Sequence, residues 1–184
     1  MPTYKFKRQE EATYKEILTM ILMSKEPRVK ALISFLYLYG CRITEALNLH
    51  NYNITITDSH IISRIGVLKR RGHSGGPYES MPHLLSVRLD APFVQEYLLP
   101  YQKQLGKDSK VFPFSRQLAW LRIKKVNPLY SPHVFRHDRI MKLALKGASE
   151  AELMDWAGWT DIRPASNYVR ATGRLAIHLT DKIE

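Results

Sequence analysis

The segment SPHVFRH, residues 131–137, places a histidine and an arginine three positions apart, directly after a proline. Proline is common in the first turn of a helix, and the residues that follow have helical spacing. We therefore predict a helix over about residues 133–146. Residues at i and i+3 share a face of a helix, so His133 and Arg136 are expected to point the same way.

Other notable segments lie at fixed intervals around this one. The stretch GCRITEAL, residues 40–47, lies far upstream and contains a second arginine, Arg42. Downstream, the tryptophan of the pair GW, residues 158–159, follows Arg136 by 23 residues, and Tyr168 comes nine residues after it. The order is arginine, histidine, arginine, tryptophan and tyrosine.

Several common catalytic motifs do not match. His133 and His137 have the i, i+4 spacing of a helical metal site, but the metalloprotease pattern needs a glutamate where this chain has valine. Arg136 and Arg139 would also repel a cation there. The glycine-rich stretch RRGHSGGP, residues 70–77, lacks the ending of a phosphate-binding P-loop, and no GxSxG occurs. We predict no metal or cofactor site.

The charge of the chain indicates its partner. It has 184 residues, with 28 Lys and Arg against 17 Asp and Glu, so its formal net charge is +11. A basic domain of this size favours polyanions such as nucleic acid. The longest apolar run, residues 31–39, is too short to span a membrane, and no basic amphipathic helix with an aromatic face is visible. We expect nucleic acid rather than a membrane.

The compartment follows from weaker signals. Cys41 is the single cysteine, so no intramolecular disulfide is possible. The first residues, MPTYKFKRQEE, lack the apolar core of a secretion signal. We expect a soluble cytoplasmic protein.

The predicted fold is one mainly α-helical domain with a small antiparallel β-sheet, the α+β class. Residues 1–9 are expected to form a flexible arm and residues 10–184 the domain. Strands are predicted at about 54–57, 61–67 and 80–89, with a turn at 58–59 and a glycine-rich hairpin tip over 72–77. Helices are predicted at about 10–23, 28–39, 43–49, 91–105, 115–126, 133–146, 149–158, 164–171 and 174–182.

The ordered motifs resemble the catalytic domain of the tyrosine recombinases, the phage integrase family. That family has an Arg-x-x-Glu-x-Leu helix start, then a His-x-x-Arg box, then Gly-His or Gly-Trp, and a nucleophilic tyrosine nine residues later. The resemblance spans about residues 10–172. It implies the recombinase catalytic fold and a site-specific recombinase or integrase. Such an enzyme cleaves and rejoins double-stranded DNA through a covalent 3′-phosphotyrosyl intermediate, without a metal or a high-energy cofactor. The resemblance also implies that the protein is associated with DNA in the cytoplasm of a host cell.

The resemblance implies a nucleophile and two phosphate-binding arginines. Tyr168 would attack the phosphodiester, which splits one difficult step into two and conserves the bond energy for rejoining. Arg42 and Arg136 would bind the non-bridging oxygens. A guanidinium suits this role because it donates two parallel hydrogen bonds and stays charged.

It also implies roles for three supporting side chains. His133 would move the tyrosine proton or hold the phosphate, and Trp159 would donate its indole N–H to the phosphate. Lys69, on the β-hairpin, would protonate the leaving 5′ oxygen, although Arg70 and Arg71 adjoin it. Glu45 is expected to orient an arginine.

The chain departs from the family pattern in several places. The hairpin segment LKRRGHSGGPYESMPH, residues 68–83, is longer and less regular than in the family. Asp138 stands where threonine is common, and Trp159 stands where histidine is more common. Most members carry an amino-terminal helical domain that clamps the other face of DNA. We expect none within residues 1–184, so that either the sequence begins at the catalytic domain or the protein is a minimal one.

Basic residues and the tail suggest further contacts. Leu175, Leu179 and Ile183 form an apolar stripe, so the tail is expected either to dock on a neighbouring protomer on DNA or to fold back on its own domain. Backbone contacts to DNA are expected from the basic residues Arg64, Lys69, Arg70, Arg71, Lys124, Lys125, Arg139, Arg163 and Arg170.

Other functions remain open at this point. A type IB topoisomerase-like enzyme or a hairpin telomere resolvase would use the same chemistry. A DNA-binding module of the same fold without catalysis is another possibility. An RNA-binding or ribosomal protein would explain the charge but not the ordered set of side chains.

Overall fold

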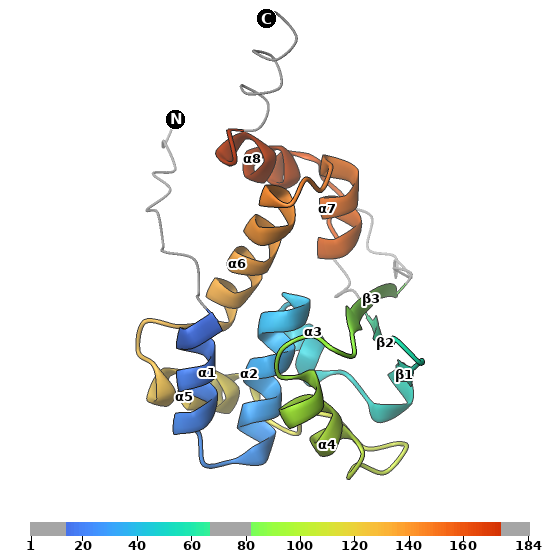
Figure 1. Cartoon of the computed structure of the whole chain (residues 1–184), viewed down its shortest axis with the longest axis vertical. Coiled ribbons are helices and arrows are strands. Elements are labelled where there is room, and N and C mark those ends of the chain that lie inside the picture. The colour runs from blue at the N-terminus through green and yellow to red at the C-terminus, as the bar shows by residue number, and fades with distance from the viewer. Residues whose placement is uncertain (1–13, 67–81, 174–184) are drawn as a thin grey trace, which may run out of the picture.

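The structure, a computed structural model, describes residues 14–66 and 82–173. It has the expected class, because most elements are helices and one small antiparallel sheet lies at one side of them (Figure 1). The elements in chain order are α1 (Tyr14–Met23), α2 (Pro27–Tyr39), α3 (Ile43–Leu47), η1 (Asn51–Asn53), β1 (Ile54–Ile56), β2 (His60–Ile65), β3 (His83–Arg88), η2 (Val94–Leu98), α4 (Leu99–Gln102), α5 (Arg116–Val126), α6 (Pro132–Leu145), α7 (Glu150–Ala157) and α8 (Arg163–Ala171).

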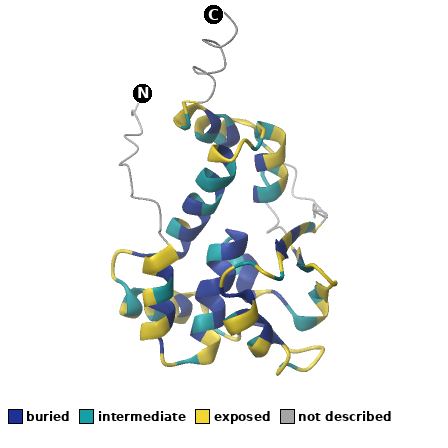
Figure 2. Ribbon diagram, viewed as in Figure 1, coloured by how far each residue is buried: buried dark blue, intermediate teal, exposed yellow. Residues whose placement is uncertain are grey.

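Helix α2 is the centre of the main hydrophobic core. Its sequence is apolar on most sides, and Figure 2 shows it buried along nearly its whole length. Helices α1 and α6 and the short helix η2 pack against it. Pro27 lies in its first turn, and Gly40 ends it in the left-handed conformation with φ 60°. This glycine sets the direction in which the chain enters α3.

The sheet has the strand order β1-β2-β3, with both pairs antiparallel. Ile61 and Ile65 of β2 and Leu85 and Val87 of β3 are buried, so one face of the sheet covers the core. At one end of the β2–β3 pair, His83 lies opposite Ile65. The predicted strands are confirmed with slightly shorter bounds.

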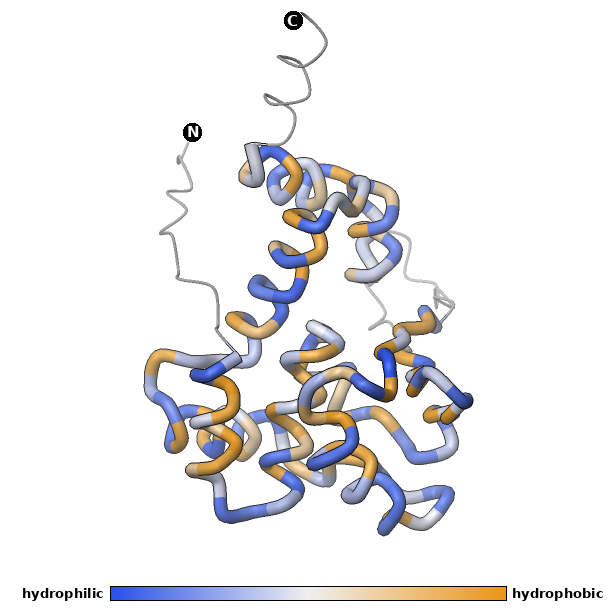
Figure 3. The backbone as a smooth tube through the Cα atoms, in the orientation of Figure 1, coloured by the Kyte–Doolittle hydropathy of each residue, from blue (hydrophilic) through white to orange (hydrophobic). Residues whose placement is uncertain are grey.

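A second, smaller core lies beyond the main one, at the end of α6 that carries α7 and α8 (Figure 1). Helix α6 belongs to both cores, because Phe135 near its start packs in the main core and Ile140 packs in the second. Figure 3 shows hydrophobic and hydrophilic residues alternating along this helix. The buried members of the second core are Ile140, Ala144, Leu153, Ala157, Ala165 and Val169.

The helix expected over 91–105 has a different form. The segment starts at Phe93 in the left-handed region, with φ 68°, and continues as a π-helical turn in which the Leu98 N–H donates to the Phe93 carbonyl. Pro100 lies in the first turn of α4, where its missing N–H cannot continue an α-helical ladder. The expected arm, the hairpin tip and the helix at 174–182 lie outside the described residues.

Candidate active site

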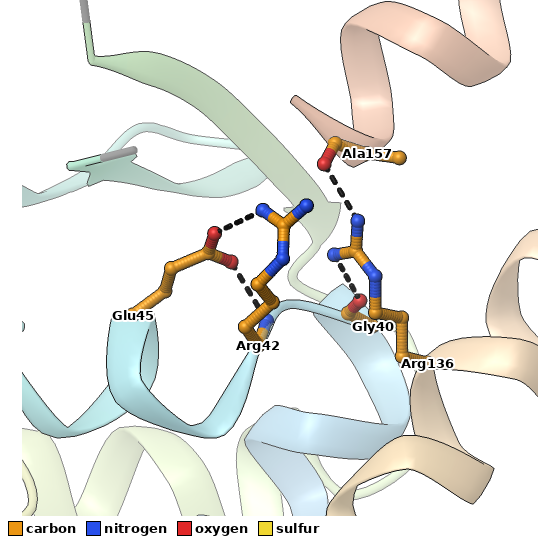
Figure 4. Close-up of polar contacts among 5 residues, drawn as sticks. All are labelled: Gly40, Arg42, Glu45, Arg136 and Ala157. Carbon is orange, nitrogen blue, oxygen red and sulfur yellow. Dashed lines mark hydrogen bonds and ion pairs between the residues drawn. The ribbon is translucent and has the colours of Figure 1, made fainter. Parts of the chain in front are cut away.

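The junction between α2 and α3 presents Arg42. Arg42 has an extended backbone and precedes the first residue of α3. The Glu45 carboxylate accepts hydrogen bonds from the Arg42 backbone N–H at 2.7 Å and from its Nη1 at 2.6 Å (Figure 4). The Glu45 side chain is fully buried, whereas Arg42 keeps part of its surface exposed. The expectation that Glu45 orients an arginine is therefore confirmed.

Arg136 is held from two sides. It lies on α6 and is buried, and its Nη1 donates to the Gly40 carbonyl at 3.2 Å. Its Nη2 donates to the Ala157 carbonyl, at the end of α7, at 2.6 Å (Figure 4). A guanidinium has five N–H donors, so these two bonds fix its plane and leave donors for an anion.

The two guanidinium groups lie close together and create a positive site. In Figure 4 the Arg42 and Arg136 guanidinium groups lie side by side, with Glu45 on the far side of Arg42. Burial lowers the pKa of Arg136, and the charge of Arg42 lowers it further, while Glu45 acts in the opposite direction. Two cations against one carboxylate leave a net positive charge. An anion beside them would relieve this repulsion.

The turn after α7 brings Trp159 to Arg136. Gly158 ends α7 with φ 60°, and the Trp159 N–H donates to the Met154 carbonyl, which closes the turn. The Arg136 Cζ lies 5.6 Å from the centre of the Trp159 ring. This contact places an aromatic surface against the buried guanidinium.

Tyr168 joins the same group of side chains from α8. Its ring stacks on Trp159, with ring centres 5.8 Å apart and planes 22° apart. Its Oη lies 2.9 Å from Nδ1 of His137, the residue after Arg136. Burial raises the pKa of Tyr168, and the charge of Arg136 opposes this shift. Burial also lowers the pKa of His137.

The structure thus brings four of the six expected catalytic residues together: Arg42, Arg136, Trp159 and Tyr168. His133 is exposed in the first turn of α6 and has no hydrogen bond or ion pair with another described residue. Lys69 lies outside the described residues. His137 was not among the expected residues, because its spacing from His133 was interpreted only as a possible metal site. Its position next to Arg136 and one turn after His133 was the available signal.

Several of the expected DNA-binding residues are exposed. Arg64 on β2, Lys125 on α5 and Arg170 on α8 lie at the surface. Lys124 donates to the Pro128 carbonyl at 2.5 Å, which holds it against its own segment. Exposed cations of this kind can reach a phosphate backbone without further rearrangement.

The remaining basic residues have protein partners or lie outside the described ranges. Arg163 is exposed and forms an ion pair with Asp161. Arg139 packs over the Trp156 ring at 5.2 Å, and its buried Nε has no hydrogen-bond partner among the described residues. Arg139 therefore faces the interior more than the other basic residues do. Arg70 and Arg71, like Lys69, are not in the described ranges.

His83 is a buried polar residue that the sequence analysis did not identify. Both of its ring nitrogens are buried and lack a hydrogen-bond partner within residues 14–66 and 82–173. Burial lowers its pKa, and the charges of Glu45 and Arg136 also act on it, in opposite directions. His83 thus lies at the end of β3 that borders the arginine site. A histidine after a proline at a strand start gave no specific signal.

Two searches of the described residues were negative. Within them, no group of three or more His, Cys, Asp or Glu side chains is arranged to hold a metal ion. No helix among them is long and apolar enough to cross a membrane.

Comparisons with known proteins agree with this geometry. The model of the phage integrase family matches residues 7–174. XerH site-specific recombinase bound to its difH substrate superimposes with a TM-score of 0.58 at 15% identity, covering 86% of this chain and 49% of that one. XerA recombinase gives 0.57 at 18% identity, covering 86% and 59%. The Tn1549 transposon integrase in complex with circular intermediate DNA gives 0.60 at 17% identity, covering 92% and 66%.

At these identities the structural likeness establishes the fold. The chain spans about half of the length of XerH, and more of the other two chains. No curated protein matches the sequence.

Proposed function

Because this chain belongs to the phage integrase family, we propose that it breaks and rejoins DNA strands with Tyr168 as its nucleophile. The proposed activity is that of a site-specific recombinase or integrase. The observation that carries the proposal is the stacked series of Arg136, Trp159 and Tyr168, which puts a phenol beside a site with two arginines.

The proposed cleavage step exchanges one phosphoester for another. The Tyr168 oxygen forms a bond to phosphorus, and the bond between phosphorus and the 5′ oxygen breaks. The product is a 3′-phosphotyrosyl link on one DNA end and a free 5′ hydroxyl on the other. Attack of a 5′ hydroxyl on this link reverses the step and rejoins a strand, so no high-energy cofactor is consumed.

The two arginines would stabilise the charge that gathers on the non-bridging phosphoryl oxygens. Arg136 suits this role because its bonds to Gly40 and Ala157 fix its orientation before DNA binds. Arg42 is also oriented before DNA binds, because its guanidinium donates a hydrogen bond to the buried Glu45 carboxylate. Loss of one such donor typically costs on the order of 3 kcal/mol of transition-state stabilisation.

Three further residues complete the proposed site. Trp159 would donate its indole N–H to a phosphoryl oxygen, since tryptophan is only a donor. His133, exposed one turn before His137, would hold the phosphate from the solvent side. Lys69 would deliver the proton that the leaving 5′ oxygen needs.

The wider surface is proposed to hold duplex DNA. The net charge of +11 supports backbone binding, which positions the enzyme without reading sequence. The exposed residues Arg64, Lys125 and Arg170 are proposed contacts, and binding should weaken steeply with added salt. Self-association on DNA is proposed to use the tail, through Leu175, Leu179 and Ile183.

Two other activities would use the same site. A type IB topoisomerase-like enzyme or a telomere resolvase shares the phosphotyrosyl step. A recombinase differs from both because it exchanges strands between two DNA sites, so an assay for that exchange distinguishes them. A DNA-binding module without catalysis would bind DNA and form no covalent link. The presence of Arg42, Arg136 and Tyr168 at one site favours an enzyme over a module that only binds DNA.

The test is covalent capture of DNA. A pool of nicked duplexes of randomised sequence includes molecules in which the nick lies a few nucleotides from a cleavage position. In these molecules the short fragment with the free 5′ hydroxyl diffuses away, and the covalent adduct stays trapped. We expect a protein–DNA adduct that survives denaturation, with a chelator present. It should disappear in Tyr168→Phe and persist in Tyr52→Phe, a matched change at an exposed tyrosine. An adduct that persists in Tyr168→Phe would refute the assignment.

A further inference from the structure

The hydroxyl of Tyr168 already has a partner that is able to take a proton. His137 on α6 and Tyr168 on α8 face each other, with Nδ1 and Oη 2.9 Å apart. The ring centres are 5.2 Å apart and the planes are tilted by 47°. This separation lies within the roughly 2.6–3.2 Å reach of a general base in a plausible geometry.

The protonation states of the pair suit a transfer from oxygen to nitrogen. Burial lowers the pKa of His137, so its ring is neutral at neutral pH. Burial raises the pKa of Tyr168, so the phenol keeps its proton until a base removes it. A neutral imidazole with its hydrogen on Nε2 accepts at Nδ1, and the phenol then donates.

The charged neighbours do not reverse the directions in which the pKa values of His137 and Tyr168 are shifted. Asp138, next to His137 on α6, raises the pKa of His137, but the effect of burial is the larger one. Asp138 is also paired with Lys142 at 2.9 Å. Helix α2 presents Tyr37 to Lys142, and the turn after α7 presents Trp159 to Tyr168.

We propose that His137 is the general base that takes the phenolic proton of Tyr168 during strand cleavage and returns it during rejoining. This inference rests on the proposed function above. As Oη bonds to phosphorus, its proton moves to Nδ1 and His137 becomes an imidazolium. The 5′ oxygen leaves with a proton from a separate acid, proposed to be Lys69. In rejoining, the imidazolium gives its proton back to Oη as the phosphotyrosyl bond breaks.

Position favours His137 over the histidine of the His-x-x-Arg box. His133 is exposed and has no hydrogen bond with another described residue, whereas His137 is half-buried and contacts the reacting atom itself. The two lie one turn apart on the same face of α6, so both can act at one site in different roles. In this assignment His133 binds the phosphate, and His137 takes the proton from the nucleophile.

The experiment compares single-turnover cleavage rates on the nicked pool between pH 5 and 9. His137→Asn keeps a polar atom near the place of Nδ1 but cannot accept the proton at these pH values. We expect its rate at pH 7 to fall about 10²-fold. The wild-type rate should rise with pH at the acid end and level off near neutrality. The rate of His137→Asn should instead keep rising into the alkaline range, where hydroxide replaces the base.

Two controls separate this role from others. His60→Asn makes the same chemical change at the far end of β2, about 17 Å along the strand from Ile65, and should leave the rate unchanged. A 5′-bridging sulfur makes the leaving group independent of a proton, so it should restore variants of the acid but not His137→Asn. At pH 7, unfolding curves and DNA binding of His137→Asn should match those of the wild type.

The outcomes are distinct. A wild-type protein that forms no adduct contradicts the proposed function itself. If the wild type forms adduct and His137→Asn keeps its rate and pH profile, the general-base assignment is wrong. A faster rate in His137→Asn would also overturn it, because the hydrogen bond would then restrain the nucleophile. Rescue by the bridging sulfur would reassign His137 to the leaving group.

Discussion

The guanidinium of Arg136 donates a hydrogen bond to the carbonyl oxygen of Gly40, which lies 96 positions earlier in the chain. Its second bond, to Ala157, reaches the end of α7. One side chain therefore ties the end of the central helix of the main core to the second core. The proposed phosphate site lies at the boundary between the two cores, because Gly40 follows a helix of the main core and Ala157 belongs to the second.

Replacing Arg136 by lysine should damage both stability and cleavage. One ammonium cannot hold both carbonyls in the guanidinium geometry and also face a phosphate. In Arg136→Lys we expect the free energy of unfolding to fall by about 1–3 kcal/mol and cleavage to fall at least about 10²-fold. Denaturant unfolding and adduct formation measure the two effects. Arg88→Lys, in an exposed pair with Asp90, is the control and should change neither. Unchanged stability in Arg136→Lys would show that the two carbonyl bonds contribute nothing.

Replacing Gly40 by alanine tests the close approach of α2 and α6. A Cβ at Gly40 would lie 2.6 Å from the Arg139 Cβ, and its φ of 60° is unfavourable for any other residue. Gly173 has a similar φ of 69°, and a Cβ there would meet no atom of the described residues within 4 Å, so Gly173→Ala isolates the backbone effect of about 1–2 kcal/mol. Calorimetric unfolding should show a clearly larger loss in Gly40→Ala. Equal losses in the two variants would mean that α6 moves aside without cost.

We expect His83 to make the protein less stable in mild acid. Burial lowers its pKa in the folded protein, so the unfolded chain binds a proton first as the pH falls. Stability should therefore decline below about pH 6.5, the ordinary imidazole pKa, and His137 adds to the decline with the same sign. His83→Leu removes the unpartnered ring nitrogens. It should raise the melting temperature at pH 7 and flatten the decline between pH 7 and 5. A melting temperature that drops at both pH values would show that the ring has a partner.

Spacing between motifs carried most of what the sequence revealed. Arg42, Arg136, Trp159 and Tyr168 could be named because their order and intervals are fixed by the elements that hold them. Glu45 followed from its i+3 position to Arg42. The helices and strands followed from apolar periodicity and from breaks such as Pro27 and Gly40.

Contacts between distant segments were not accessible in this way. The bond between His137 and Tyr168 depends on how α6 and α8 pack, and no local pattern encodes that angle. The π-helical turn after Phe93 arises from a left-handed residue that the sequence does not mark. That the His83 ring nitrogens are buried without a partner among the described residues is likewise visible only when the burial of each atom is known.

Tyr168, the proposed nucleophile, packs against the second core, which is much smaller than the main one. Three of its six buried residues are alanines, and it stands apart from the larger core that keeps Arg42 and Glu45 in place. Few apolar contacts mean a low free energy of local opening, so backbone amides in α8 should exchange with solvent before those in α2. Hydrogen exchange read by mass spectrometry would show this order. The proposed nucleophile, Tyr168, therefore packs against the core that we expect to open first, whereas Arg42 and Glu45 lie beside the core that we expect to stay closed.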